Sequence, residues 1–426
     1  MESKEDILKD LQSLPSGYTK EQLKELQSLP LEDKIRITQD RIREWYEHFD
    51  GKVCISLSGG KDSTVLLHLV RELFPDVPAV FSDTGLEFPE VRAFARNFQN
   101  TDIVRPKMDF RSVIETYGYP IVSKEVATRI HYARKITHKD LERSGIIPRI
   151  AKIGGGINDA RTGQSCLTGN ETANAYLSTY TGRQKLTDHL MYSEKTKNVS
   201  DMDQLKEKMR LQKSMFNIKQ WLPLAEKAPF KISHYCCEIM KKSPIAIYQR
   251  SSKFKPYIGT MATESLLRKQ AWLKHGCNAF DSKKAISTPM AFWTEQDVLE
   301  YISTRNIEIA SVYGDINVDE KGKYYTTGCS RTGCVFCGFG AHLDKRNRFA
   351  RLKHTHPKLW DYCMRGGQWA DNPDYVDGLT EEPDEYGFVP WNPKKIWTPS
   401  ADGLGMRYVF DVFNEMYPKS PIIYED

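Results

Sequence analysis

The sequence predicts an α/β fold with a parallel sheet, a helical N-terminal extension and a cysteine-rich C-terminal region. A short apolar run at 53–57 leads into a glycine-containing turn, and apolar residues at helical spacing follow at 63–74. A second apolar run at 79–82 and a second helical pattern at 89–98 repeat this order, and residues 103–104 begin another extended piece. Strands that alternate with helices in this way are typical of a parallel sheet with right-handed crossovers.

Length and composition exclude several classes of protein. The chain has 426 residues, of which 40% are hydrophobic and 27% charged. This length suggests two or three domains of about 150 residues each and excludes a miniprotein held by disulfides. The nine cysteines favour thiolate chemistry or metal binding in a reduced compartment. The opening MESKEDILKD is charged and no run of 18 apolar residues occurs, so we expect a cytoplasmic protein with no membrane partner.

The pattern along the chain divides it into three parts. Residues 1–50 read as a helical extension in two pieces, broken near residues 14–17. Residues 51–325 form the α/β domain, with a basic helical insertion near 125–225, and residues 326–426 are rich in cysteine, then in aromatic residues and proline. Within the insertion, the segment from Arg129 to Lys152 carries seven basic and two acidic residues. This segment is either a surface for phosphates or nucleic acid or the solvated face of a helix.

Three further helices are expected after the insertion. One passes through Cys236 and Cys237, and another occupies 263–275 after a strand at 256–259. The third begins at Thr294, because Thr294 and Asp297 have the spacing of a capping box.

The segment Ser58-Gly59-Gly60-Lys61-Asp62-Ser63 has the composition of a phosphate-binding loop. Its two glycines let backbone N–H groups face an anion, the following helix N-terminus adds partial positive charge, and Lys61 and Ser63 supply side-chain donors. The spacing is not that of a Walker A loop. The alternative is an ordinary turn between a strand and a helix.

This loop resembles a known superfamily. SLSGGKDSTVLLHL is similar to the PP-loop of the adenine nucleotide α-hydrolases, and FSDTGLEFPEVRAF to the second element of the phosphoadenylyl-sulfate (PAPS) and adenylyl-sulfate (APS) reductases. The resemblance implies a parallel-sheet PP-loop domain that binds ATP or a sulfonucleotide, with Asp62 holding Mg²⁺ or orienting the loop. It implies Lys61, Asp62 and Ser63 as catalytic residues, and nucleotide contacts from Ser58, Gly59, Gly60, Lys61, Asp62, Ser63, Asp83, Thr84, Gly85 and Gly259.

Two cysteine elements resemble those of cluster-containing adenylyl-sulfate reductases. CCEIMKKSP is similar to C-C-x-x-x-K-x-x-P, and TGCVFC to G-C-x-x-C. Between them, GTMATES is similar to the substrate-binding G-x-R-x-x-[QE]-S, and STPMAFWTEQDVLEYISTRNIEIASVYGD is similar to another family run. The resemblance implies a [4Fe–4S] cluster held by Cys236, Cys237, Cys334 and Cys337. Zinc and four unliganded thiols are the alternatives.

The sequence departs from the reductases at three places. Met261 stands where GTMATES would carry arginine, and Cys329 is an extra cysteine before the second element. The C-terminal E-C-G-[LI]-H segment that carries the attacking thiol of the reductases has no match, and Cys363 is the one cysteine after Cys337.

These observations predict a PAPS-reductase-like PP-loop enzyme with an iron–sulfur cluster. In the superfamily that the loop resembles, an intact S-G-G-K-D-S is typical of members that cleave ATP at the α-phosphate. The resemblance therefore implies that this protein adenylates an acceptor for sulfur transfer. Nucleic acid is a candidate for the acceptor, and a protein that donates sulfur or supplies electrons is a candidate partner. The alternatives are a true sulfonucleotide reductase with a different thiol and a non-catalytic module that binds nucleotide or nucleic acid.

Overall fold

The computed structural model describes residues 17–134, 221–280, 285–378 and 391–425. The chain forms two compact units, each assembled from two segments. Unit 1 comprises residues 1–109 and 238–335, and unit 2 comprises residues 110–237 and 336–426. The sequence analysis divides the chain into three consecutive parts, 1–50, 51–325 and 326–426. Each unit of the structure instead combines two segments that are separated in the sequence. Among the described residues, no helix has the length and apolar character needed to cross a membrane.

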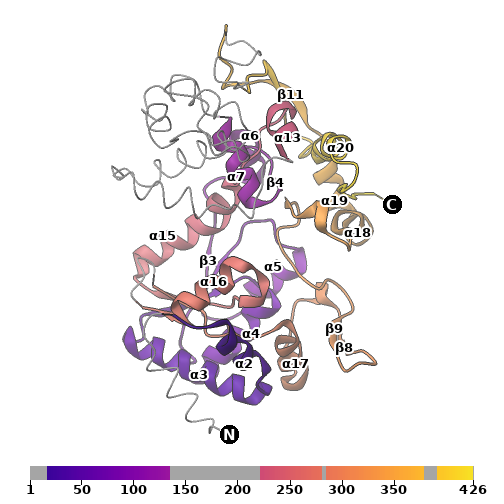
Figure 1. Ribbon diagram of the computed structural model, residues 1–426. Coiled ribbons are helices and arrows are strands. Elements are labelled where there is room, and N and C mark those ends of the chain that lie inside the picture. Colours follow the sequence, from indigo (N-terminus) through magenta and orange to yellow (C-terminus); the bar gives the residue numbers. More distant parts are fainter. Residues whose placement is uncertain (1–16, 135–220, 281–284, 379–390, 426) are drawn as a thin grey trace, which may run out of the picture. The chain divides into compact units, whose positions relative to one another are not determined.

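Unit 1 is built on a six-stranded sheet (Figure 1). The strand order is β3 (Thr101–Val104), β2 (Ala79–Ser82), β1 (Val53–Leu57), β5 (Lys255–Ile258), β7 (Ile286–Ser287) and β6 (Asn278–Ala279). Neighbouring strands are parallel except β6, which runs antiparallel to β7. The predicted α/β fold with a parallel sheet is therefore confirmed.

The order reverses at β1, whose neighbours are β2 on one side and β5 on the other. In a parallel sheet, ligands bind at the carboxyl ends of the strands where the order reverses. The helix α4 (Lys61–Leu73) begins at this end of β1, and α5 (Pro89–Arg96) follows β2. The predicted strands at 53–57 and 79–82 have the observed bounds, and the two helices begin and end within two residues of the expected positions.

The N-terminal helices belong to the core of unit 1. Trp45 of α3 (Leu31–His48) is fully buried, and Leu23 of α2 (Lys20–Ser28) lies in the same cluster as Leu66 of α4. The expected break near residues 14–17 lies almost wholly outside the described residues. Within them, a break that was not expected separates α2 from α3 at Leu29–Pro30, because proline cannot donate the backbone hydrogen bond that a continuous helix needs.

The later helices of unit 1 carry residues of the candidate site. A π-helical turn, Glu238–Lys242, leads into α15 (Ser243–Ser252), and a 3₁₀ turn, Ala262–Glu264, precedes α16 (Leu266–His275). The expected helix at 263–275 is thus divided between a 3₁₀ turn and α16. The helix α17 (Glu295–Arg305) begins after Thr294, whose hydroxyl accepts from the Asp297 N–H while the Asp297 carboxylate accepts from the Thr294 N–H. This confirms the predicted capping box.

Unit 2 is mainly helical. Its first segment holds α6 (Phe110–Tyr117), β4 (Ile121–Val122), α7 (Lys124–Ala133), α13 (Leu222–Lys227) and the short α14 (Tyr235–Cys237). Its second segment holds β10 (Gly338–Phe339), α18 (Arg348–Thr355), α19 (Pro357–Met364), β11 (Gln368–Asp371), β12 (Lys395–Thr398) and α20 (Met406–Met416). The strand β10 pairs in parallel with β4, which joins the two segments.

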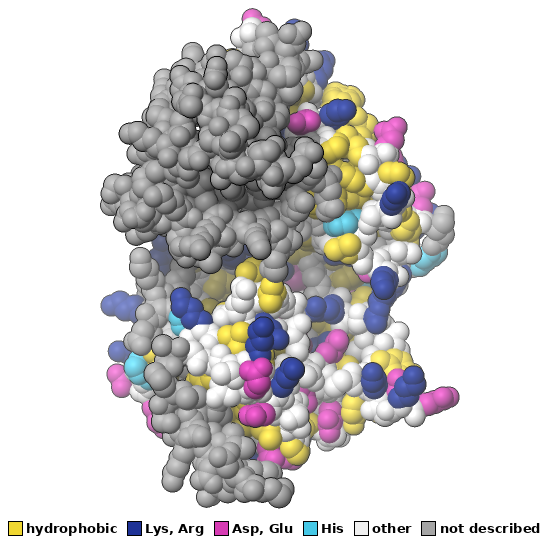
Figure 2. All heavy atoms as spheres, in the orientation of Figure 1, with side chains coloured by type: hydrophobic (Ala, Val, Ile, Leu, Met, Phe, Trp, Pro, Cys, Tyr) yellow, Lys and Arg dark blue, Asp and Glu magenta, His cyan; other side chains and the backbone are white. Residues whose placement is uncertain are grey.

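The predicted basic stretch 129–152 lies mostly outside the described residues, as does most of the predicted insertion, and these parts are grey in Figure 2. On the face drawn there, the described surface carries Lys and Arg side chains interspersed with Asp and Glu. Such mixing of signs is ordinary for a protein surface.

Candidate functional site

The loop between β1 and α4 has the backbone that its glycines predict. Gly59 has φ +71°, and a Cβ at this position would lie 2.8 Å from the Val91 Cγ1 and 2.9 Å from the Val91 carbonyl oxygen. A side chain here would therefore meet both an unfavourable φ and the start of α5. Gly60, the residue before α4, has no side chain to cap the helix, so the first turn of α4 faces the loop without a capping side chain.

Two serines hold this turn in shape. The Ser63 hydroxyl lies 2.9 Å from the Ser58 hydroxyl, accepts from the Ser58 N–H at 3.1 Å and donates to the Gly60 carbonyl at 3.0 Å. The first and last residues of the loop are therefore hydrogen-bonded to each other. The Ser58 N–H donates to the Ser63 hydroxyl and the Gly60 N–H to the Ser58 hydroxyl at 3.3 Å, so these contacts fix the backbone of the turn.

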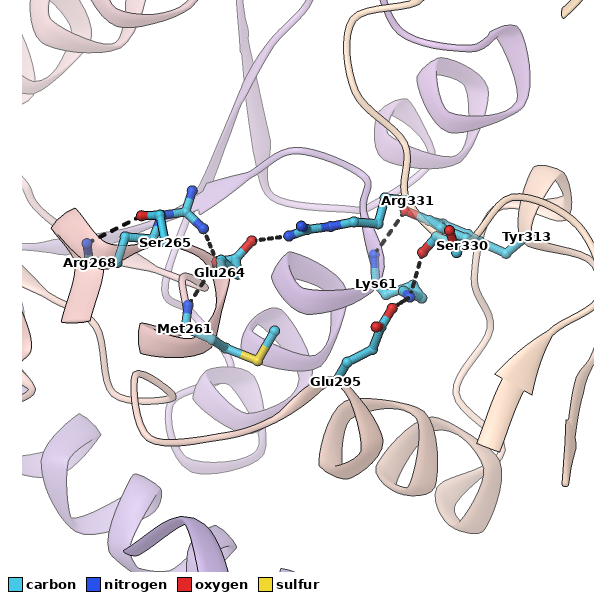
Figure 3. Close-up of polar contacts among 9 residues, drawn as sticks. All are labelled: Lys61, Met261, Glu264, Ser265, Arg268, Glu295, Tyr313, Ser330 and Arg331. Carbon is cyan, nitrogen blue, oxygen red and sulfur yellow. Dashed lines mark hydrogen bonds and ion pairs between the residues drawn. The ribbon is translucent and has the colours of Figure 1, made fainter. Parts of the chain in front are cut away.

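Lys61 is buried although it carries a charge. Only 5% of its side chain is exposed, and its Nζ donates to Glu295 Oε1 at 2.9 Å and to the Ser330 carbonyl at 2.7 Å (Figure 3). The Nζ also lies 5.5 Å from the centre of the Tyr313 ring. Lys61 thus connects the loop with α17 and with the segment before Cys334, whereas the lysine of an ordinary turn between a strand and a helix would be exposed to solvent.

Charged and polar groups surround Lys61 in the site. Burial raises the pKa of Asp62, and the positive charges of Lys61 and Arg331 oppose this rise without cancelling it. The Tyr313 hydroxyl accepts from the Lys61 N–H at 3.3 Å and lies 2.6 Å from the Thr332 hydroxyl. A side-chain network therefore extends from the first turn of α4 to the loop before Cys334.

A cavity of about 470 Å³ opens at the loop. Its lining combines the loop with β5, the turn before α16, the start of α17 and the segment before Cys334, and includes Ser58, Gly60, Lys61, Asp62, Ser63, Lys241, Gly259, Met261, Glu264, Arg268, Glu295, Tyr313, Ser330, Arg331 and Thr332. A Cβ on Gly259 would lie 2.8 Å from the Asp62 carbonyl oxygen, so glycine is needed where β5 approaches α4. This volume lies within the range of small-molecule pockets.

The segment Asp83-Thr84-Gly85, which is predicted to contact the nucleotide, does not line this cavity. The Asp83 carboxylate is fully buried and pairs with Arg92 at 2.6 Å and with Arg96. Burial opposes ionisation of Asp83, but the hydrogen bonds from these two arginines outweigh burial and lower its pKa. The Thr84 hydroxyl donates to Glu87 at 2.7 Å. Asp83 and Thr84 therefore hold the start of α5, while Gly85 has φ +72° and open space where a Cβ would project.

The four predicted cluster cysteines are divided between the two units. Cys236 and Cys237 end the first segment of unit 2, with their sulfurs 4.0 Å apart, and Cys337 belongs to its second segment. Cys334 belongs to unit 1. Within the described residues, no three His, Cys, Asp or Glu side chains are placed to hold a metal ion. The chemistry of four thiols suits an iron–sulfur cluster, and that assignment stays a prediction from the sequence.

The two remaining candidate thiols differ in environment. Cys363 in α19 is fully buried, and burial raises the pKa of its thiol. Cys329 is partly buried, and its backbone N–H donates to the Val312 carbonyl at 2.9 Å. Cys363 therefore has neither the access nor the ionisation that an attacking thiolate needs.

Several cavity residues were not among those predicted. Glu295 and Tyr313 lie in the stretch that resembles the family run, and Arg331 lies three residues before Cys334. The capping box at Thr294 is a second sequence signal near Glu295, because it fixes Glu295 as the first residue of a helix. No sequence pattern pointed to Arg268.

Comparison with known proteins identifies a family. A model of the phosphoadenosine phosphosulfate reductase domain matches residues 52–138 and 170–338. An uncharacterized protein of Methanocaldococcus jannaschii is 32% identical over 115 residues, which are 23% of this chain and 28% of that protein. A phosphoadenosine 5′-phosphosulfate reductase of Vibrio parahaemolyticus is 35% identical over 74 residues, 17% of this chain and 29% of that protein.

Other similar proteins carry the same description. A phosphoadenosine 5′-phosphosulfate reductase of Thiocapsa roseopersicina is 39% identical over 66 residues, 15% of this chain and 24% of that protein. The chain thus matches less than a third of the length of each of these relatives. A crystal structure of phosphoadenylyl-sulfate reductase from Candida auris, in complex with phosphate, aligns over 72% of this chain and 97% of that chain, with 12% identity and a TM-score of 0.29.

Proposed function

Because the chain belongs to the phosphoadenosine phosphosulfate reductase family, we propose that it is a PP-loop enzyme that binds Mg-ATP in the 470 Å³ cavity and cleaves it at the α-phosphate. The observation that carries this proposal is the buried Lys61, held at the cavity by Glu295 and Ser330. A lysine ammonium at this place can exchange those partners for phosphate oxygens. Buried cations of this kind stabilise the charge that develops during phosphoryl or nucleotidyl transfer.

The proposed reaction has two steps. An oxygen of the acceptor attacks the α-phosphorus of ATP, the bond to the β-phosphate breaks, and pyrophosphate leaves with its electron pair. A sulfur donor then attacks the acceptor carbon, and AMP leaves with the former acceptor oxygen. Asp62 and Glu295 line the cavity as carboxylates that can hold Mg²⁺ together with the phosphates. Nucleic acid is the candidate acceptor, because the sequence carries the basic stretch 129–152.

The proposal includes a [4Fe–4S] cluster on Cys236, Cys237, Cys334 and Cys337. Support comes from the two cysteine elements and from the chemistry of four thiolates. In unit 1, Cys334 closes the segment Ser330–Cys334, whose first three residues line the cavity. Cys334, one of the four proposed ligands, follows Thr332 by two residues in the sequence.

The second candidate function is reduction of a sulfonucleotide. The family and the names of the relatives favour it. The burial of Cys363 counts against it, because reduction by a thiol needs an accessible thiolate.

The two candidates consume different substrates. We would purify the protein without air and supply either Mg-ATP with bulk tRNA as the acceptor probe or adenylyl sulfate and its 3′-phosphate with thioredoxin. Pyrophosphate release from ATP supports the proposed function. Sulfite release without pyrophosphate would establish the second candidate instead, and release of neither product would contradict both.

A further inference from the structure

Unit 2 carries a basic segment that lies wholly within the described residues, unlike the stretch 129–152. Residues 344–358 include six lysines and arginines and one acid, Asp344. They form the turn after Leu343, the helix α18 and the start of α19 (Figure 1). The proposed reaction makes no use of this positive charge.

Asp344 fixes the turn that presents the first two cations. Its carboxylate accepts from the Arg346 N–H at 3.0 Å and from the Arg348 N–H at 3.3 Å. The Arg348 guanidinium pairs with the same carboxylate at 3.1 Å and donates to the Phe339 carbonyl at 2.7 Å. The one acid of the segment is thus paired within the turn, and the exposed Lys345 and Arg346 are carried by a hydrogen-bonded backbone.

The outer side of α18 continues the positive surface. The buried residues of this helix are all apolar, namely Phe349, Ala350 and Leu352. Arg351 and His354, three positions apart, lie on the opposite side, where helical spacing makes them neighbours. Lys358 follows, exposed, in the first turn of α19. Basic side chains therefore occur from the turn before α18 to the start of α19.

Acids of the neighbouring elements do not cancel this charge. Most of them are bonded to other side chains, namely Asp361 to Arg365, Glu425 to Arg407 and Asp411 to the Tyr424 hydroxyl. Burial, and after it the negative charge of Glu415, raises the pKa of Tyr408. Residues 341–365 and 406–425 together include nine lysines and arginines and five acids. Within the described residues, no ion pair or side-chain hydrogen bond involves Lys345, Arg346 or Lys358.

An aromatic ring lies beside the same helix. The centre of the Trp360 ring in α19 is 5.0 Å from Lys353 Nζ and 5.6 Å from the guanidinium carbon of Arg407. The Trp360 Nε1 donates to the Tyr424 carbonyl at 2.9 Å, which fixes the indole. Surfaces that bind nucleic acid combine cations for the phosphates with aromatic rings for the bases.

We propose that the turn 344–347, the outer side of α18 and the start of α19 form a basic surface that binds the phosphate backbone of nucleic acid. The inference rests on the proposed function only in taking nucleic acid as a partner of this chain. Phosphates match such a surface whatever the base sequence.

An acidic membrane suits this surface less well than nucleic acid. A helix that lies on a membrane buries a row of apolar side chains in the lipid, whereas the apolar side of α18 is buried in the protein. Leu343, which is 71% exposed, is the one exposed large hydrophobic residue of the described segment 341–365. The charge of the surface thus has no apolar row to accompany it.

The test measures binding of a fluorescein-labelled single-stranded RNA of mixed sequence by fluorescence anisotropy over a range of salt concentrations. Each phosphate contact with a single strand contributes about 0.7 to the slope of log affinity against log salt, which is about 5-fold at about 0.1 M salt. We expect the double variant Lys345→Gln/Arg346→Gln to bind about 25-fold more weakly at this concentration and to lower the slope by about 1.4.

A matched control removes the same charge elsewhere. Lys321 and Lys323 are exposed lysines in the turn between β8 (Ile316–Val318) and β9 (Tyr324–Thr326) of unit 1. Lys321→Gln/Lys323→Gln should bind the RNA like the parent protein. An equal loss in this control would show that net charge alone sets the affinity, and it would overturn the surface.

A charge-conserving variant separates binding from a structural role. Lys345→Arg/Arg346→Lys keeps both charges and should keep both the affinity and the salt slope. Thermal melting should be unchanged in all three variants, because the substituted side chains are exposed. Parent-like binding by Lys345→Gln/Arg346→Gln, or an equal loss in the charge-conserving variant, would refute the surface. Binding of the parent to phosphatidylserine vesicles but not to RNA would establish a membrane surface instead.

The outcome is distinguishable from that of the proposed function. If Lys345→Gln/Arg346→Gln weakens RNA binding while the parent releases no pyrophosphate from ATP, the basic surface stands and ATP cleavage falls. If the parent cleaves ATP and the variant binds RNA as tightly as the parent, the proposed function stands and the surface falls. If the parent neither binds RNA nor cleaves ATP, both are refuted.

Discussion

Lys61 donates a hydrogen bond to the Ser330 carbonyl at 2.7 Å, and this contact ties the phosphate loop to the segment before the C-x-x-C element. The two residues are 269 positions apart in the sequence. A phosphate that draws Lys61 Nζ toward itself competes directly with Ser330. Under the proposed function, nucleotide binding and the position of the segment ending at Cys334 would therefore be linked through one side chain.

Lys61→Ala should abolish nucleotide turnover while the fold persists. We expect a loss of at least about 100-fold in α-phosphate cleavage, the size seen when a preorganised charge-stabilising group is removed. The partner Glu295 is 52% exposed, so its carboxylate stays hydrated, but the Ser330 carbonyl loses its donor, and the free energy of unfolding should fall by about 1–3 kcal/mol. Pyrophosphate assays and thermal melting check both parts. Full activity in Lys61→Ala would remove the loop from consideration as the site.

Lys34 and Asp297 form a buried ion pair between α3 and α17. Lys34 Nζ lies 2.7 and 2.8 Å from the two Asp297 oxygens, and only 2% of the Lys34 side chain is exposed. Lys34→Met should cost about 3–5 kcal/mol, because it leaves a poorly solvated carboxylate without its cation. Urea unfolding measures this loss.

The exposed pair of Arg305 with Glu32 provides the control for this ion pair. Arg305→Gln should cost about 1 kcal/mol or less. Adding Asp297→Asn to Lys34→Met should recover part of the loss, because the buried charge disappears. A cost for Lys34→Met no larger than that of the control would contradict the argument.

Local features of this molecule could be read from the sequence. The apolar strand 53–57, the two glycines of the loop and the capping box at Thr294 each depend on residues a few positions apart, and each is present as expected. The break at Leu29–Pro30 was missed because the apolar spacing continues across it. Proline at that point was the signal that should have outweighed the periodicity.

The partners within the site could not be read in this way. Glu295 lies 234 positions from Lys61, and Arg331 lies 67 positions from Glu264, so no local spacing relates them. The ion pairs of Asp83 with Arg92 and Arg96 were likewise not expected from the family resemblance, whose implied place for Asp83 beside the nucleotide stays a prediction. Those arginines follow on α5 at helical spacing, but only the fold shows that they turn toward the end of β2.

Asp83 should make stability depend on pH in the acid range. Its folded pKa is lowered below the unfolded value of about 3.9. The ionised carboxylate therefore contributes its full stabilisation above about pH 3.9 and loses it as the pH falls through the folded pKa. Asp83→Asn should be less stable than the parent protein at pH 7, and the difference should shrink as the pH falls below about 3.9. Urea unfolding across this range measures it, and a constant difference would refute the role of the charge.

The cluster assignment predicts iron in protein purified without air. We expect a brown protein with broad visible absorption that loses its iron in Cys334→Ser and in Cys337→Ser, because each variant lacks one thiolate ligand. Cys329→Ser is the matched control, since Cys329 lies close in sequence to Cys334 and is not among the four ligands, and it should keep its iron. A colourless protein with stoichiometric zinc would replace the cluster by a zinc site.

The burial of Cys363 predicts that no stable thiol adduct forms with a sulfonucleotide. Reduction through a thiol requires a thiolate to attack the sulfur, so that the S–O bond to the nucleotide breaks and an S-sulfonated cysteine remains. Cys363 is 0% exposed and burial raises the pKa of its thiol, so the attacking species is scarce and shielded. Intact-protein mass spectrometry after incubation with adenylyl sulfate or its 3′-phosphate should therefore show unmodified protein.

Two further measurements decide how that result is interpreted. Alkylation of Cys363 in urea, but not in buffer, would show that burial in the fold protects the thiol. A sulfonate adduct on Cys363 or Cys329 that disappears when that residue becomes serine would mean that the thiol does reach the nucleotide. The enzyme would then be a sulfonucleotide reductase, and ATP-driven sulfur transfer would be the wrong interpretation of the intact loop, because the same Lys61 can neutralise a phosphosulfate as well as a triphosphate.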